Sequence, residues 1–63
     1  MDRHSRITAL QLATRCEFPY VIHEAGRDRI VISAKLSTLS GRVYITFEDG
    51  EEIDVPQMCQ LAV

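Results

Sequence analysis

The most reactive side chains in this chain are two thiols and two imidazoles, contributed by Cys16, Cys59, His4 and His23. A nucleophilic cysteine needs a neighbouring base, and none of the four lies in a sequence context typical of such a pair. A zinc site would need ligands in close pairs, whereas these four residues are widely spaced. We therefore expect no catalytic residues, no bound metal and no cofactor.

The carboxylates are more informative because they are unevenly distributed. All seven basic residues lie at or before Arg42, whereas the chain from Val43 onward contains no Lys or Arg. A local negative field attracts basic partner surfaces and repels phosphate. Acid–base chemistry would need two carboxylates in a dry concave site, so we expect these acids to serve either protein binding or solubility. The candidate protein-binding residues are Glu48, Asp49, Glu51, Glu52 and Asp54.

These acids belong to a stretch with the pattern of a β-hairpin. Apolar and polar residues alternate over residues 43–47 and again over residues 52–55, as in half-buried strands. A three-residue loop ending at Gly50 sets Ile45 opposite Ile53, so that the apolar residues of both strands share one face. We expect a type I turn in which Gly50 takes the left-handed conformation.

A short helix is predicted over residues 8–16, ahead of the strands. Thr8 and Gln11 have the spacing of a capping box, in which each side chain accepts from the backbone of the other residue. The helix must end before Pro19, because the residue preceding a proline avoids the helical region. Residues 1–7 are expected to form a flexible arm.

Two further strands are predicted between the helix and the hairpin. Tyr20–Glu24 reads as one strand and residues 29–37 as a long, bent second strand. Proline after Val55 ends the hairpin, and residues 60–63 form a short last strand. The alternation in the long strand predicts that its core-facing residues are Ile30, Ile32, Ala34 and Leu36. Residues 1–63 are expected to form one domain, with the strands in residues 20–63.

This order of elements resembles the small SH3-like barrels of the Sm-like type, and it is similar to the Rho-binding antiterminator (Rof) family. Leu-Gln-Leu-Ala at residues 10–13 lies where that family has its helix, residues 29–34 match its second strand, and residues 43–55 match its acidic hairpin. The resemblance implies an α+β, mostly β fold, with a short N-terminal helix on a five-stranded, strongly bent antiparallel barrel. It also implies a Rho-like partner.

We therefore expect a cytoplasmic, non-enzymatic regulator or inhibitor in transcription termination or antitermination, which presents the acidic residues to a basic surface of a larger nucleic-acid-handling machine. No run of residues is apolar and long enough for a membrane span, and the protein would be a monomer or small homo-oligomer. One alternative is an Sm-like RNA-binding homo-oligomer. Another is a small subunit that completes the sheet of a partner through an open edge at residues 61–63. The RNA-binding residues of the first alternative would be Tyr20, Arg27, Arg29, Arg42 and Tyr44.

Overall fold

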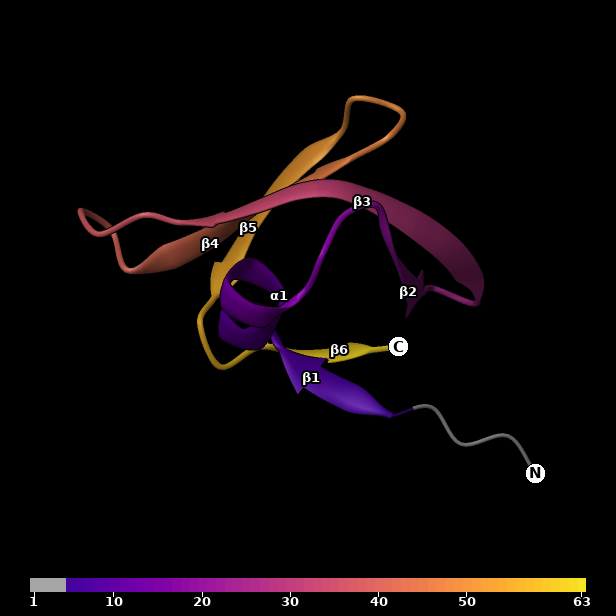
Figure 1. The fold of residues 1–63 in the computed structure, drawn as a ribbon, viewed down its shortest axis with the longest axis horizontal. Helices are drawn as coiled ribbons and strands as arrows, with labels where there is room; N and C mark the ends of the chain where they lie inside the picture. The colour runs from indigo at the N-terminus through magenta and orange to yellow at the C-terminus, as the bar shows by residue number, and fades with distance from the viewer. Residues whose placement is uncertain (1–4) are drawn as a thin grey trace.

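The computed structural model describes residues 5–63, and this part of the chain is mostly β with one short helix (Figure 1). Within it, no helix is long and apolar enough to cross a membrane. In chain order the elements are β1 (Arg6–Thr8), α1 (Ala9–Arg15), β2 (Tyr20–Glu24), β3 (Arg27–Leu36), β4 (Arg42–Phe47), β5 (Glu52–Pro56) and β6 (Gln60–Ala62).

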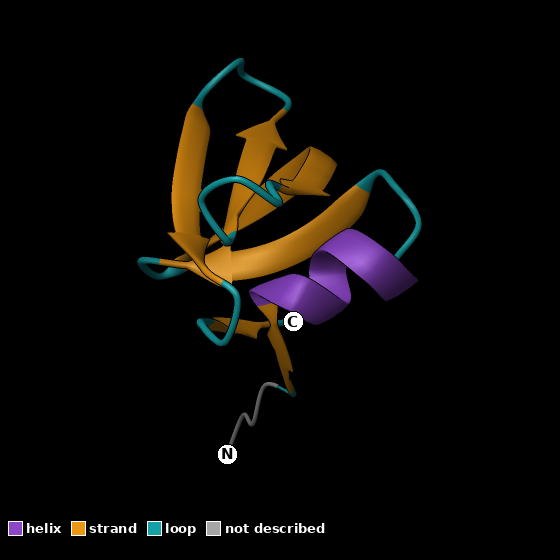
Figure 2. Ribbon diagram, turned by 90° about the vertical axis from the view of Figure 1, so that its left-hand side faces the viewer, coloured by secondary structure: helices purple, strands orange, loops and turns teal. Residues whose placement is uncertain are grey.

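The strands form a single antiparallel sheet in the order β1-β6-β2-β3-β4-β5. The ten residues of β3 arch across the molecule, and the sheet curls strongly into a half-barrel (Figures 1 and 2). The helix α1 packs against β3, β4 and β1. The architecture is compatible with small SH3-like and Sm-like barrels.

The capping box predicted for the helix is confirmed. The Gln11 amide donates to Thr8 Oγ1 at 3.1 Å, and the Thr8 amide donates to Gln11 Oε1 at 2.8 Å. Cys16 at the other end has extended backbone, so the helix ends one residue before the predicted limit. Seven residues are too few for a stable isolated helix, and α1 depends on burying Ala9 and Leu12, both fully inaccessible to solvent.

The core lies between the helix and the inner face of the curled sheet. It is made of aliphatic side chains and one aromatic ring, drawn from α1 and three strands. Half-buried apolar residues pack around it, and they include residues of β1, β5 and β6. The buried core residues are Ala9, Leu12, Ile22, Val31, Ala34, Val43, Ile45 and Phe47.

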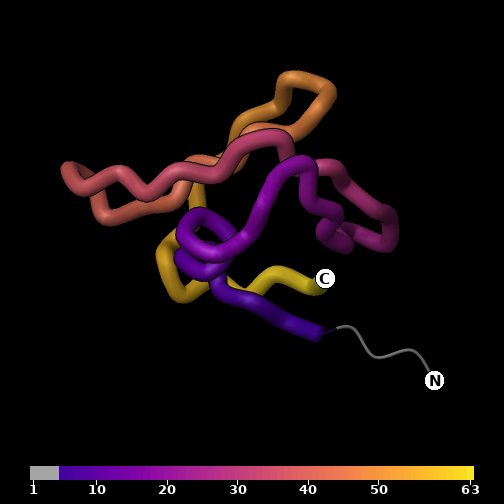
Figure 3. Tube along the Cα trace, viewed as in Figure 1, coloured from indigo at the N-terminus to yellow at the C-terminus, as the bar shows by residue number. Residues whose placement is uncertain are grey.

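The number of strands differs from the prediction because both ends of the described chain pair with each other. Arg6–Thr8 forms β1 on β6, so the sheet has six strands where five were expected. The flexible arm expected over residues 1–7 is therefore wrong for residues 6 and 7, while residues 1–4 lie outside the described residues. Figure 3 shows the first and last described segments running side by side. The sequence did not predict β1 because a strand of three residues, paired with a strand so far along the chain, has no recognisable local pattern.

The predicted open edge at residues 61–63 is also wrong. The strand β6 lies inside the sheet, with β1 on one side and β2 on the other through the pair His23 and Ala62. Within residues 5–63, the strands at the two ends of the sheet are β1 and β5.

The predicted alternation in β3 is wrong over its first half. Val31 is completely buried and Ile32 is 48% exposed, the reverse of the expectation. The cause is a register shift between Val31 and Ser33, a bulge that moves successive side chains to the opposite face. Beyond the bulge Ala34 is buried as predicted, whereas Leu36 is 37% exposed.

The predicted register of the β4–β5 hairpin is confirmed. Ile45 lies opposite Ile53, and Gly50 has φ of 93°. The Gly50 amide donates to the Phe47 carbonyl at 2.9 Å, and the Phe47 amide donates to the Glu51 carbonyl at 2.8 Å, which closes the loop over residues 48–50.

Candidate functional site

The five predicted protein-binding acids lie on and beside the β4–β5 turn, and all five are exposed. Two are in the loop, one follows it and two lie along β5. We call this set the acidic hairpin, composed of Glu48, Asp49, Glu51, Glu52 and Asp54.

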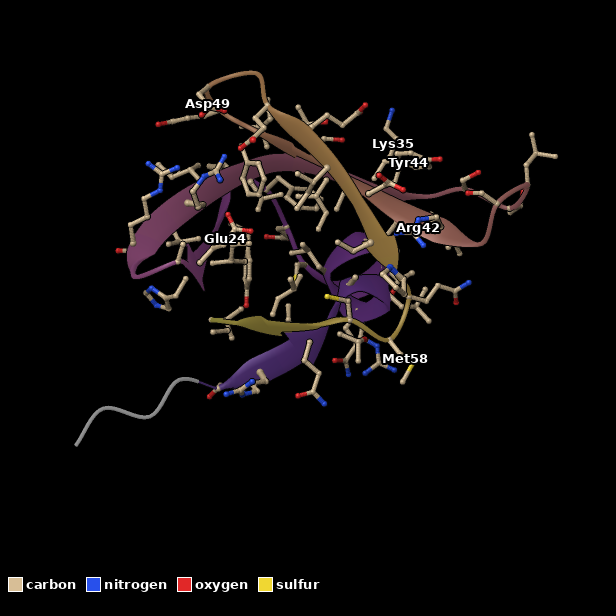
Figure 4. The ribbon with its side chains drawn as sticks, turned by 180° about the vertical axis from the view of Figure 1, so that it is seen from behind. Glu24, Lys35, Arg42, Tyr44, Asp49 and Met58 are labelled. Carbon is tan, nitrogen blue, oxygen red and sulfur yellow. The ribbon has the colours of Figure 1, made fainter. Side chains whose placement is uncertain are left out.

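A buried arginine holds the tip of the acidic hairpin. Arg29 on β3 is 8% exposed, and its Nη1 donates to Glu24 Oε1 at 2.8 Å. Its Nη2 donates to Glu51 and lies 3.7 Å from Asp49 Oδ2. The Arg29 Cζ atom lies 3.8 Å from the centre of the Phe47 ring. Figure 4 shows Glu24 and Asp49 at the same end of the molecule.

These contacts stabilise the charged guanidinium of Arg29 at the rim of an apolar core. The delocalised cation stacks on Phe47, and carboxylates from two different hairpins satisfy its donors. The hydrogen bond to Glu51 is the main cause of a raised pKa for Arg29, which keeps it charged. Sequence reasoning missed this role, because Arg29 shares the inner face with Val31 only when the bulge in β3 is known.

A second arginine neutralises the far end of the acidic hairpin. Arg42 Nε donates to Asp54 Oδ2 at 2.6 Å, and its Nη2 donates to the Asp54 backbone carbonyl at 3.3 Å. Glu52 accepts from the Thr46 hydroxyl at 3.5 Å, a long and weak bond. Within residues 5–63, Glu48 and Glu52 have no cationic side chain as a partner. Within the acidic hairpin, the negative charge available to another molecule is therefore concentrated on these two residues.

No family model, curated protein or solved structure matches this chain. Its functional class must therefore be argued from the surface that the half-barrel presents.

The five residues of the RNA-binding alternative do not form one basic surface. Arg29 is buried among carboxylates and Arg42 is paired with Asp54, so the charge of each is already opposed by a neighbouring carboxylate. Tyr20 is half-buried against the core, and burial together with the nearby Cys16 thiol raises the pKa of its hydroxyl. The remaining two residues, Arg27 and Tyr44, lie apart from these three. Arg27 is exposed at the start of β3, beside the β2–β3 turn.

Tyr44 lies elsewhere, on the outer face of β4. It stands opposite Lys35 on β3 and opposite Asp54 on β5, and Figure 4 shows Lys35 and Tyr44 together. This row combines one cation, one aromatic ring and one anion. It does not provide the continuous positive groove that single-stranded RNA requires.

The thiols and the described imidazole have structural surroundings and do not form a catalytic or metal-binding group. Cys16 and Cys59 are free and half-buried against the core. His23 Nδ1 pairs with Asp28 Oδ1 across the β2–β3 hairpin, and His4 lies outside the described residues. In the part of the chain that the structure describes, no three of the His, Cys, Asp and Glu side chains are grouped to hold a metal ion.

Proposed function

We propose that this chain is a non-enzymatic protein-binding regulator, which presents the acidic hairpin to a basic surface of a larger nucleic-acid-handling machine. The supporting observation is that Glu48 and Glu52, in the loop and at the start of β5, are exposed without a cationic partner in the described chain, while Arg29 holds Asp49 and Glu51 between them. Two exposed anions whose backbone is fixed by the hairpin attract a cationic surface.

We propose a Rho-type transcription termination factor as the machine. Apart from the added strand β1, the half-barrel, the early helix and the late acidic hairpin follow the element order that resembles the antiterminator family. A surface that binds RNA must be basic, so an acidic protein that covers it would compete with RNA. The protein would then act as an inhibitor by occupation, without chemistry.

The RNA-binding ring is the weaker candidate because of the pairing of its arginines. Arg29 would have to leave its carboxylates before touching a phosphate, and a phosphate bound to Arg42 would lie beside the Asp54 carboxylate. Releasing Arg29 would also end its stacking contact with the Phe47 ring and uncover that ring.

The test is a pull-down with the tagged protein from the source organism, with and without nuclease, followed by mass spectrometry. Glu52→Lys is compared with Glu17→Lys, because both residues are exposed and the change in charge is the same. Glu51 is unsuitable for this comparison, since a lysine there would face Arg29 and disturb the fold.

We expect the wild type and Glu17→Lys to retain a Rho-type factor after nuclease treatment, and Glu52→Lys to lose it. Equal retention by both variants would refute a role for the acidic hairpin. Retention that disappears with nuclease, with RNA in the untreated eluate, would favour the RNA-binding alternative.

A further inference from the structure

The strand β5 ends the sheet, so it has one row of backbone groups without a neighbouring strand in the described chain. The bond between the Phe47 amide and the Glu51 carbonyl fixes which groups these are. Hydrogen-bonded and non-hydrogen-bonded pairs alternate in an antiparallel ladder, so Ile53 and Val55 direct their backbone groups toward β4. The amides and carbonyls of Glu52 and Asp54, and the carbonyl of Pro56, point away from it.

The side chains of β5 differ sharply between its two faces. Glu52 and Asp54 are exposed on the outer face, while Ile53 and Val55 are half-buried and pack against the rim of the core. A strand added at this edge would place alternate side chains beside each set. The alternating acidic and apolar side chains of β5 are therefore complementary to a segment in which basic and apolar residues alternate.

A donor from the protein itself already occupies part of this edge. Arg42 Nη2 donates to the Asp54 carbonyl at 3.3 Å, while Arg42 Nε holds the Asp54 carboxylate at 2.6 Å. The first contact takes the place of a backbone N–H of an added strand, and the second takes the place of a basic side chain on it. Arg42 thus imitates two groups of such a strand and also blunts an edge that would otherwise promote aggregation.

The opposite edge of the sheet offers far less. The strand β1 has three residues, and the Thr8 amide is already bonded to the Gln11 side chain in the capping box. The edge at β5 is therefore better suited than the edge at β1 to pair with an added strand.

We propose that the β5 edge is the docking site for an extended segment of a protein partner, in which Lys or Arg alternates with Val or Ile. The segment adds to the sheet beside β5, covers Ile53 and Val55, and places a cation on Asp54 after displacing Arg42. The basic character of this segment rests on the proposed function, whereas the pairing of its backbone is a separate claim.

Backbone pairing is tested with a labelled peptide of about seven residues that alternates Lys and Val, measured by fluorescence anisotropy. Two further peptides carry N-methyl groups on the odd or on the even amides, so that charge and side chains stay constant. If the peptide adds as a strand, one methylated peptide should bind at least about tenfold more weakly than the other, because only one set of amides faces β5. Equal binding of the two methylated peptides, or no binding of the parent peptide, overturns the proposal.

Displacement of Arg42 is tested by comparing Arg42→Ser with Lys35→Ser. Lys35 lies on the outer face of β3 across from Tyr44, and its loss changes the net charge by the same amount. We expect Arg42→Ser to bind the parent peptide at least about threefold more tightly than Lys35→Ser does, because the edge is no longer occupied. Equal affinities would refute the displacement step.

The two proposals fail in different ways. If Glu52→Lys abolishes peptide binding and both methylated peptides bind as well as the parent, the interaction is electrostatic and the acidic hairpin stands without strand addition. If one methylated peptide is selectively weakened but no Rho-type factor is captured from the lysate, the edge docks a strand and the proposed machine is wrong.

Discussion

Replacing Leu12 by alanine should remove much of the stability of this protein. Leu12 is the largest side chain that α1 contributes to the core, and its exposed fraction is zero. A buried Leu→Ala change typically costs 2–5 kcal/mol, so we expect a loss of about 3 kcal/mol in the free energy of unfolding. A domain of this size has roughly 3–9 kcal/mol in total. The midpoint of thermal unfolding should fall by about 10–25 °C.

The same substitution at Leu39 provides a matched control. Leu39 lies in the β3–β4 turn and is 99% exposed, so its replacement by alanine should change the free energy of unfolding by less than about 0.5 kcal/mol. Urea unfolding followed by far-ultraviolet circular dichroism suits both variants, because the chain has no tryptophan. If Leu12→Ala falls within about 1 kcal/mol of Leu39→Ala, then packing of α1 on the sheet does not limit stability and the reasoning fails.

Two other predictions concern the hairpin turn and a tyrosine. Gly50 has φ of 93° and an added Cβ would meet no atom within 4 Å, so Gly50→Ala should cost about 1–2 kcal/mol through backbone strain alone. Gly50→Asn should cost less in the same urea assay, and an alanine variant as stable as the wild type would contradict the turn geometry. Burial, followed by the Cys16 thiol, raises the pKa of Tyr20 above its ordinary value in the folded state. The folded protein therefore holds this proton more tightly than the unfolded chain, and the free energy of unfolding should fall as the pH rises above about 10. Tyr20→Phe should remove part of this decline, and a decline equal to that of the wild type would argue against the assignment.

Local signals in the sequence were sufficient for the helix start and the late hairpin. The capping box depends on two residues three positions apart, and the register of Ile45 with Ile53 follows from the length of one turn. Both are short-range features, so neither requires knowledge of the rest of the fold.

Features that depend on distant pairing were missed. The strand β1 exists because of β6, and the bulge in β3 exchanged the positions of Val31 and Ile32 relative to the core. The same bulge explains why the burial of Arg29 was not predicted. For the candidate site, the sequence identified the acids but not their internal partners, and these partners reduce five candidate anions to the pair Glu48 and Glu52.

The pairing of β1 with β6 also governs how quickly this protein can fold. It closes a loop that spans almost the whole described chain, and the first amides of α1 donate to carbonyls next to β6, from Ala9 to Cys59 at 2.8 Å and from Leu10 to Gln57 at 3.0 Å. The helix is local in sequence, yet its start is anchored by contacts of the longest range. High contact order slows folding, so this small protein should fold in milliseconds or longer, with its helix forming late.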